Sequence, residues 1–345
     1  MNILAIESSC DETACAIVQN GVLEIASIVA SSKELHEATG GIVPEIAARK
    51  QIEFIIPVIE QTLLKSSLSS DQIDAVAVTV GPGLIGSLLV GVEAAKALAF
   101  AWNKPLIPVN HLVGHIYANF IKRDSKDNIP AQPGVDAIKF PVVVLIISGG
   151  HTDLVLMRGH GELTYIGGTL DDAAGEAYDK TARLLGLAQY LGGAQLSKLA
   201  ATCTNNLAKG TLPRPMLDQN NFDFSFSGLK TAVKNLIATQ TYPADAVALE
   251  FENAVGDVIV SKTIKAAQKF GCTQILMGGG VSANKYLRDR LTKEAAAKDI
   301  KVFVPALDLC TDNAIYIASA AFFNNNPKEL SEINANPSLG VMDPV

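Results

Sequence analysis

The segment that decides the fold reads Pro141-Val142-Val143-Val144-Leu145-Ile146-Ile147-Ser148-Gly149-Gly150-His151-Thr152. Its first half is continuously apolar and rich in β-branched residues, which is typical of a strand buried on both faces. Its second half is small and polar and predicts a tight turn with backbone amides open to a ligand. A strand at Asp153 to Arg158, a glycine hairpin and a strand at Glu162 to Gly167 complete a three-stranded meander.

The amino terminus repeats this organisation. Asn2 to Ser8 predicts a buried strand, Ser8-Ser9-Cys10-Asp11-Glu12-Thr13 a polar turn, and Ala14 to Gln19 a second strand. Asn20-Gly21 is a strong hairpin signal that leads into a third strand, Val22 to Val29. Duplication of this kind indicates a fold built from two related halves.

A third glycine-rich element lies late in the chain. The run Gln274-Ile275-Leu276-Met277-Gly278-Gly279-Gly280-Val281-Ser282-Ala283-Asn284 predicts a buried strand, a glycine loop and the start of a helix from Lys285 to Lys298. Such loops and helix amino termini bind phosphate through backbone amides without lysine. Two meanders with phosphate-sized turns, followed by an adenosine loop, are typical of the α/β actin-like ATPase superfamily of sugar kinases, heat-shock chaperones and actin. There, two ribonuclease-H-like domains face a nucleotide cleft.

We therefore expect two actin-like domains. The first covers residues 1–110 and a C-terminal helix at about 312–345, and carries metal-facing loops. The second covers residues 111–311 and carries the phosphate and adenosine loops. The polar, proline-containing segment Lys122 to Gly134 is expected to link the halves. Further elements of the first half are expected at Pro44–Lys65 (helix), Ala75–Val80 (strand), Leu84–Trp102 (helix) and Leu106–Val109 (strand).

Amino-acid composition limits the kinds of protein to which this chain can belong. The 345 residues are 48% hydrophobic and 18% charged, with a net charge of −7, so a nucleic acid would need a local patch or partner chains to bind. Five scattered cysteines without a CxxC motif favour a reduced, cytoplasmic setting. No signal peptide is evident, and Glu93 and Lys96 in the apolar Leu84–Trp102 segment argue against a membrane span.

The run Gly81-Pro82-Gly83-Leu84-Ile85-Gly86 matches the GxGxxG dinucleotide fingerprint only formally. Pro82 removes an amide donor from the loop, and the next strand ends in Asn110 without a ribose-binding acid. The glycines are better explained by close passage of another backbone. We therefore do not expect a nicotinamide site.

Two histidines four residues apart, His111 and His115, predict a pair of metal ligands on one face of a helix. The zinc-protease motif has the same spacing but places a glutamate after the first histidine, where this chain has Leu112. The pair could equally be two polar residues near a surface. Asp312, at the predicted start of the last helix, is the best candidate for a third, anionic ligand, although a helix cap would also explain it.

Acidic residues gather in two further places. Asp11 and Glu12 lie in the first meander turn, which suits a metal- or phosphate-facing loop better than an ordinary exposed one. The segment Leu170 to Lys180 holds four acids, and the spacing of Asp179 from Asp171 and Asp172 would let them line one face near a nucleotide. A solvated helix face would explain some of them.

Together these motifs closely resemble one family, the tRNA N6-adenosine threonylcarbamoyltransferases, formerly described as O-sialoglycoprotein endopeptidases, and in particular its bacterial branch. The resemblance covers nearly the whole chain. The segments that carry it are Glu7–Thr13, Gly81–Gly83, His111–His115, Ser148–Thr152, Asp171–Lys180, Phe224–Thr231, Gly278–Asn284 and Thr311–Ala314.

The resemblance implies a reaction and its site residues. The threonylcarbamoyl group of threonylcarbamoyl-AMP moves to N6 of adenosine 37 in tRNAs that read codons beginning with A. One divalent metal, Fe²⁺ in preference to Zn²⁺, would be held by His111, His115 and Asp312. The adenylate would be bound by Ile146, Ile147, Ser148, Gly149, Gly150, Asp179, Gly193, Ser197 and Asn284. We expect Asp11, with Glu12 beside it, to act as a base or to align the amine.

One loop departs from the family pattern. The usual Tyr-Pro-Gly-Gly-Pro reads Tyr190-Leu191-Gly192-Gly193-Ala194 here, and a common acid soon afterwards becomes Ser197. The loop therefore lacks two prolines and an acid that would contact ribose.

Other functions stay open at this point. The fold alone would also suit an actin-like ATPase or kinase, the histidine pair a metalloprotease, and a non-catalytic scaffold would lack that pair. The resemblance further implies tRNA, an inactive paralogous subunit in a heterodimer and a small P-loop ATPase as partners, and no membrane. We expect the paralogue to contact the segment Glu34 to Lys65.

Overall fold

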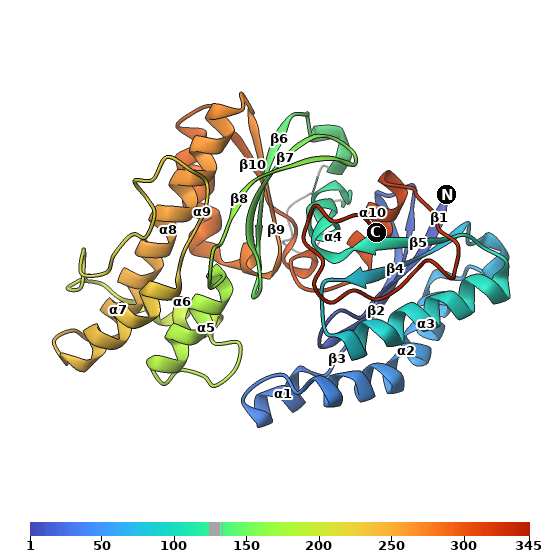
Figure 1. Ribbon diagram of the computed structural model, residues 1–345, viewed down its shortest axis with the longest axis horizontal. Helices are drawn as coiled ribbons and strands as arrows, with labels where there is room; N and C mark the ends of the chain where they lie inside the picture. The colour runs from blue at the N-terminus through green and yellow to red at the C-terminus, as the bar shows by residue number, and fades with distance from the viewer. Residues whose placement is uncertain (124–131, 133) are drawn as a thin grey trace. The chain divides into compact units, whose positions relative to one another are not determined.

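The computed structural model describes residues 1–123, 132 and 134–345. The chain divides into two compact units (Figure 1). The first comprises Met1–Ile138 and Pro305–Val345, and the second comprises Lys139–Val304. Each unit has its own sheet, helices and apolar core, as expected for a domain.

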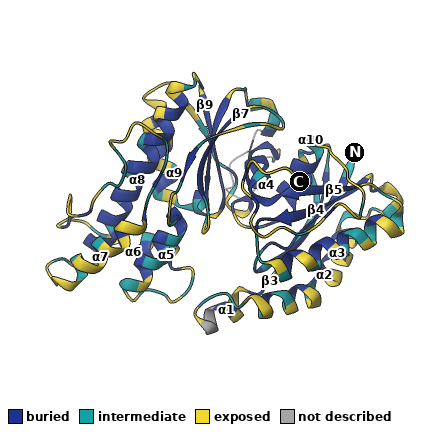
Figure 2. Ribbon diagram, viewed as in Figure 1, coloured by how far each residue is buried: buried dark blue, intermediate teal, exposed yellow. Residues whose placement is uncertain are grey.

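The sheet of the first unit has the strand order β3-β2-β1-β4-β5. Strands β1 (Asn2–Glu7), β2 (Glu12–Gln19) and β3 (Leu23–Ser31) form the expected antiparallel meander. Strands β4 (Ala75–Gly81) and β5 (Leu106–Asn110) continue the sheet in parallel with β1. The parallel strands are buried along their whole length, in keeping with their continuous apolar sequence (Figure 2).

The second sheet repeats this topology strand for strand. Its order is β10-β9-β6-β7-β8, with β6 (Val142–Ile147), β7 (Thr152–Gly159) and β8 (Glu162–Gly168) as the meander. Strands β9 (Gln274–Gly278) and β10 (Lys301–Phe303) then lie parallel to β6. The duplication predicted from the sequence is therefore confirmed, and with it the presence of two halves of the same design.

Helices cover both faces of the first sheet. On one face lie α2 (Pro44–Ser66) and α3 (Ile85–Trp102), and on the other α4 (His111–Tyr117) and α10 (Ile315–Phe323) (Figure 1). The short helix α1 (Lys33–Thr39) precedes α2. A core between the first of these faces and the sheet contains Ile6, Val78 and Val92 without exposed surface.

The helices of the second unit lie to one side of its sheet (Figure 1). They are α5 (Ala174–Leu184), α6 (Gly193–Thr202), α7 (Ser227–Ala238), α8 (Ala244–Lys269) and α9 (Lys285–Ala296). The long helix α8 is buried over most of its length (Figure 2), and Phe251, Val255 and Val258 belong to the core that it forms with the sheet.

The observed division differs from the predicted one. Residues 111–138 and 305–311 belong with the first unit, not the second, because α4 continues directly from β5 and packs against α10. The last helix begins at Ile315 and ends at Phe323, so it is shorter than the expected 312–345. Most of the predicted linker, residues 124–131 and 133, lies outside the described residues.

Helix α3 is, among the described helices, the one long and apolar enough to cross a membrane by length and composition. Its position in the first unit gives the apolar residues another explanation. Leu88, Val92 and Ala95 are buried against the sheet, and Lys96 donates to Glu93 at 3.0 Å on the outer side. One face of the helix packs on the sheet, while Ile85, Leu89 and Phe100 on the other face stay exposed.

Candidate functional site

The histidine helix α4 is placed by the end of β5. Asn110 closes the strand and caps the helix, since its side chain accepts a hydrogen bond from the Leu112 amide at 2.9 Å. Gly114 allows α10 to come close: a Cβ atom there would lie 2.7 Å from side-chain atoms of Tyr316 and Ile317. The two histidines therefore face the segment that precedes α10.

That segment supplies the third predicted ligand. Oδ1 of Asp312 lies 3.5 Å from Nε2 of His111 and 3.5 Å from Nε2 of His115. One ligand atom from each residue falls within 4.8 Å of the others. The histidines are 9% and 1% exposed and the Asp312 side chain is 22% exposed, so the group is nearly enclosed except on the side of Asp312. The structure brings the His111–His115–Asp312 triad together as predicted.

The donor set fits a divalent transition metal. Two imidazole nitrogens and one carboxylate oxygen are common ligands of Zn²⁺ and Fe²⁺ and leave positions for substrate oxygen atoms. Asp312 is set in place by its neighbour Asn313, whose side-chain oxygen caps α10 by accepting from the Ile315 amide at 3.0 Å. The expected capping role therefore belongs to Asn313, and the Asp312 carboxylate stays available to the triad.

Sequence reasoning missed Glu7, the last residue of β1. Its carboxylate has no exposed surface and lies 3.0 Å from Nδ1 of His111. It also accepts hydrogen bonds from the Ser9 amide at 2.6 Å and from the Thr79 hydroxyl at 2.5 Å. A carboxylate behind a ligating histidine fixes the ring and its tautomer and raises its basicity. The sequence feature that could have pointed to Glu7 is a charged residue at the end of a buried strand.

Burial and charge shift the titration of this cluster. Burial lowers the pKa of His111, but Glu7 and Asp312 outweigh it and raise that pKa to about 9. Burial raises the pKa of Asp312 to about 6, against the influence of His111. Without a metal, the positive charge of protonated His111 compensates the surrounding carboxylates, and a bound metal ion would take over that task.

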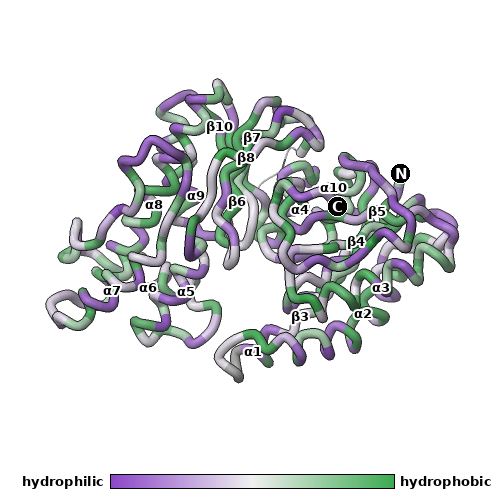
Figure 3. Tube along the Cα trace, viewed as in Figure 1, coloured by the Kyte–Doolittle hydropathy of each residue, from purple (hydrophilic) through white to green (hydrophobic). Residues whose placement is uncertain are grey.

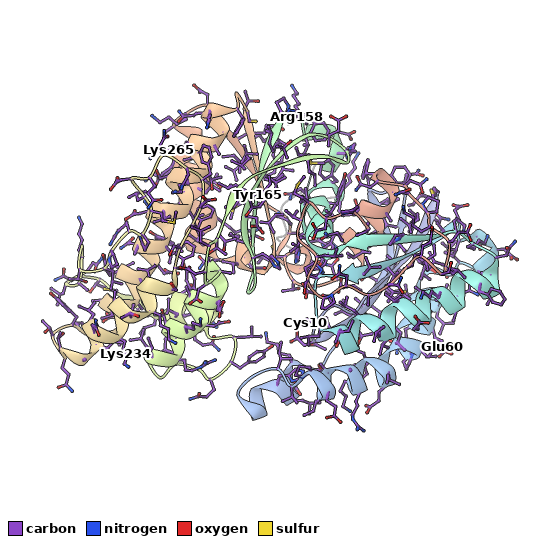
Figure 4. The ribbon with its side chains drawn as sticks, viewed as in Figure 1. Cys10, Glu60, Arg158, Tyr165, Lys234 and Lys265 are labelled. Atoms are coloured by element: carbon purple, nitrogen blue, oxygen red, sulfur yellow. The ribbon has the colours of Figure 1, made fainter. Side chains whose placement is uncertain are left out.

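The predicted catalytic pair, Asp11 and Glu12, lies beside Asp312. Burial raises the pKa of Glu12 to about 10, and the charges of Asp312 and Asp11 add to the effect. Without a bound metal, the raised pKa favours the protonated form of Glu12 at neutral pH. Cys10, labelled in Figure 4, precedes them, and burial together with the Asp11 and Asp312 charges raises the pKa of its thiol far above the ordinary value.

In the second unit, the predicted phosphate loop follows β6. Gly149 and Gly150 are exposed, and a Cβ atom at either position would meet nothing within 4 Å. The loop is fixed at its base, where the Ser148 amide donates to the carbonyl of His151 at 2.8 Å. The side chains of Ile146 and Ile147 are fully buried in the sheet, so any role of theirs would be limited to the backbone.

The remaining predicted adenylate residues form two contacts. Asp179 on α5 accepts a hydrogen bond from the Gly193 amide at 2.9 Å, at the start of α6. One turn later on α6, Ser197 accepts from the side-chain nitrogen of Asn284 at 3.0 Å. Asn284 also caps α9, accepting from the Leu287 amide at 3.1 Å.

A second acid that the sequence did not reveal joins this group. Glu252 of α8 is 2% exposed and accepts hydrogen bonds from Ser197 at 2.5 Å and from Asn284 at 3.3 Å. Its position in the middle of a long helix gave no pattern from which a site could be predicted.

The acids of the segment Leu170 to Lys180 do not share one face, contrary to the expectation. Asp171 and Asp172 precede α5 and turn away from Asp179 to other partners. Asp171 accepts four hydrogen bonds from the start of α7, two from amides and two from the hydroxyls of Ser225 and Ser227. Asp172 pairs with Lys180 at 2.7 Å. Of the acids at 171, 172 and 179, only Asp179 contacts a predicted adenylate residue.

The loop that departs from the family pattern has an unusual backbone. Leu191 has a φ of 47°, in the left-handed region. Proline is held near −65° and could not take this conformation. The loop therefore adopts a backbone conformation at Leu191 that proline at this position could not adopt.

Charge is divided unequally between the two units. The first contains 10 basic and 20 acidic residues, a balance of −10, whereas the second contains 18 basic and 15 acidic residues, a balance of +3. The net charge of −7 thus belongs to the first unit. Lys and Arg are themselves unevenly divided, 10 in the first unit against 18 in the second, so the sequence impression of an even spread was wrong.

Comparison with known proteins identifies a family. The model of the family described as tRNA N6-adenosine threonylcarbamoyltransferase matches residues 24–319. A protein of that description from Bacillus subtilis is 47% identical over 347 residues, which cover 98% of this chain and 95% of the relative. One from Thermomicrobium roseum is also 47% identical, over 94% of this chain and 92% of the relative.

Solved structures support the fold. The full-length HypF structure in its phosphate- and nucleotide-bound form matches 94% of this chain and 46% of that protein, with a TM-score of 0.63 and 13% identity. The activator of the 2-hydroxyisocaproyl-CoA dehydratase from Clostridium difficile with bound ADPNP matches 94% of this chain and 95% of that one, with a TM-score of 0.51 and 16% identity. The predicted actin-like ATPase fold is confirmed.

Proposed function

The chain belongs to the tRNA N6-adenosine threonylcarbamoyltransferase family, and from that premise we propose that it transfers a threonylcarbamoyl group from threonylcarbamoyl-AMP to N6 of adenosine 37 in tRNA. The observation that carries the proposal is the nearly enclosed His111–His115–Asp312 triad. An ATPase or kinase of this fold needs no such triad. A protease of the histidine-helix class would need an acid where Leu112 stands.

The triad would hold one divalent metal, Fe²⁺ or Zn²⁺. Bound there, the ion would supply Lewis-acid polarisation of a carbonyl or phosphate oxygen. The chain's own contribution is to hold both imidazoles with Nε2 toward Asp312 and to keep His111 in the required tautomer through Glu7.

The second unit would bind the adenylate. The exposed backbone of Gly149 and Gly150 suits the approach of a phosphate group, since no side chain blocks it. Asp179 with Gly193 and Ser197 with Asn284 offer hydrogen-bonding groups for the nucleoside. Amides directed at the phosphate would also stabilise the charge that AMP gains as it leaves.

In the reaction, the N6 nitrogen forms a bond to the carbamoyl carbon, and the bond from that carbon to the phosphate oxygen breaks. AMP leaves with the bonding electrons, and N6 loses a proton. We assign the acceptance of this proton to Asp11. Burial and the neighbouring carboxylates raise the pKa of Glu12, so we prefer Asp11 to Glu12 for this role.

For the macromolecular partners, we propose tRNA as the acceptor and a paralogous subunit and a small P-loop ATPase as companions in a cytoplasmic complex. The positive balance of the second unit makes it the part of the chain that favours contact with tRNA phosphates. Helix α2 suits the paralogue. Along it hydrophobic and hydrophilic residues alternate (Figure 3), yet Ile52 and Ile56 are 63% and 55% exposed.

The test is transfer of labelled threonylcarbamoyl from its adenylate to unmodified tRNA, with the companion subunits supplied. We expect the native chain to label adenosine 37, and Asp11→Asn to lower the rate by about 100-fold or more, in the range of general-base catalysis. Unimpaired transfer by Asp11→Asn would remove the base assignment while leaving the transferase proposal intact.

A further inference from the structure

One buried carboxylate has no part in the chemistry above. Glu252 lies behind Ser197 and Asn284, and the side chains of both donate hydrogen bonds to it. Three elements therefore meet at one carboxylate: α6, α8 and the start of α9. Burial raises the pKa of this acid, whereas the hydrogen bonds from Ser197 and Asn284 favour its ionised form, which is the form that accepts from both.

This arrangement decides whether the Ser197 hydroxyl can donate a hydrogen bond to a ligand or only accept one from it. A serine has one proton to donate and two lone pairs to accept with. The proton of Ser197 goes to Glu252 at 2.5 Å, because a carboxylate can only accept. One lone pair takes the Asn284 amide at 3.0 Å. Since Ser197 is only partly buried, the second lone pair is left for a ligand, and it can bind only a donor.

We propose that Glu252 is a positioning residue that holds Ser197 as an acceptor for a ribose hydroxyl of the adenylate. The inference rests on the proposed function, because it takes the adenylate as the ligand. It also gives a physical meaning to the loss of the family's acid at position 197. A carboxylate there would present acceptors only, and a serine whose proton is committed to Glu252 presents the same polarity.

The test compares the binding of AMP, 2′-deoxy-AMP and 3′-deoxy-AMP to the full-length chain by calorimetry. The native chain is expected to bind AMP about 3- to 10-fold more tightly than the analogue without the recognised hydroxyl, the value of one hydrogen bond. In Ser197→Ala and in Glu252→Gln this preference should fall to less than about 2-fold, while the affinity for that analogue stays within about 2-fold of native. In Glu252→Gln, the side-chain amide can donate a hydrogen bond to the Ser197 oxygen, so the Ser197 proton would point toward the ligand.

The matched control is Ser261→Ala, on α8 and away from the cluster, which should keep the native preference. Melting curves verify that each variant is folded, and Ser197→Ala serves if Glu252→Gln is unstable. Glu252→Gln weakening all three nucleotides equally would show a merely structural role and overturn the inference. So would a native chain without any preference among them.

Two further outcomes separate this inference from the proposed function. In the first outcome, the native chain binds both deoxy nucleotides as tightly as AMP but binds IMP more weakly. The Ser197 oxygen would then accept from the adenine amino group. The ribose assignment would be wrong, whereas the proposal that the chain binds the adenylate would be supported. If the native chain binds no adenine nucleotide, the adenylate site of the proposed function fails, and the inference fails with it.

Discussion

The carboxylate of Glu7 lies 3.0 Å from Nδ1 of His111, and neither oxygen of that carboxylate is exposed to solvent. Glu7 thereby leaves Nε2 as the atom that His111 turns toward Asp312. The orientation of a ligating histidine by such a partner commonly accounts for a 10- to 100-fold change in metal affinity. The proposed metal site is therefore a group of four residues, of which three would bind the ion.

We expect Glu7→Gln to lower the affinity for Co²⁺ or Zn²⁺ by about 10- to 100-fold. The amide cannot accept the imidazole proton with the strength of a carboxylate, so the ring loses both basicity and its fixed tautomer. Spectroscopic titration with Co²⁺ measures the affinity and the geometry of the site together. Glu332→Gln, an exposed residue of the same unit, is the control. Native affinity in Glu7→Gln would refute the positioning role.

Metal binding should depend on pH through His111. Its pKa of about 9 means that the metal must displace a proton at neutral pH, so affinity should rise by up to about tenfold per pH unit and level off above pH 9. Titrations between pH 6.5 and 9.5 test this. A pH-independent affinity across that range would contradict the charge state assigned to His111.

The same proton stabilises the metal-free fold. The folded pKa of His111 exceeds its ordinary value of 6.5, so its contribution is complete below pH 6.5 and is lost as the pH rises through about 9. We expect the melting temperature of the chelator-treated protein to fall over this interval. His111→Asn should remove about half of that fall, because Glu12, whose pKa is raised to about 10, contributes a similar slope over the same interval. An unchanged slope in this variant would assign the whole effect to other groups.

Asp171 anchors α7. It binds the first amides of the helix and the hydroxyls of Ser225 and Ser227, as a capping residue does. Asp171→Ala should lower the free energy of unfolding by about 1–2 kcal/mol. Urea denaturation measures this, with the exposed Asp218→Ala as the comparison. Equal stability of the two variants would show that the contacts add nothing net.

The proposed partner surface on α2 is tested with Ile52→Asp and Ile56→Asp. A charge at either position should weaken the complex with the paralogous subunit by about tenfold or more while metal affinity stays native, because both side chains point away from the core. Leu307→Asp, a similarly exposed apolar residue of the same unit, should bind normally. If all three variants bind alike, the contact lies elsewhere.

The sequence predicted those features that depend on local pattern. Both meanders follow from alternating runs and glycine turns, and the histidine pair follows from the spacing of two residues on one helix turn. Asp312 could be predicted as the third metal ligand because the two neutral histidines needed an anionic ligand beside them. The start of α10 was placed three residues early, because Asn313, whose side chain accepts from the Ile315 amide, and Ala314 both precede the first helical residue.

What could not be predicted depends on contacts between distant parts of the chain. Glu7 is 104 residues from His111, and Glu252 is 55 residues from Ser197. In the sequence both read as an isolated charge within a strand or helix. The boundary at Ile138 was missed for the same reason, since only the packing of α4 against α10 assigns residues 111–138 to the first unit.

The most direct test of the central claim combines transfer with metal content. Native chain and His115→Ala are each supplied with unmodified tRNA, labelled threonylcarbamoyl-AMP and the companion subunits, and bound metal is quantified in the same samples. We predict label on adenosine 37 with the native chain, and joint loss of label and metal in the variant. Equal labelling by a variant that has lost its metal would contradict the role of the triad, and no labelling by the metal-loaded native chain would contradict the transfer itself.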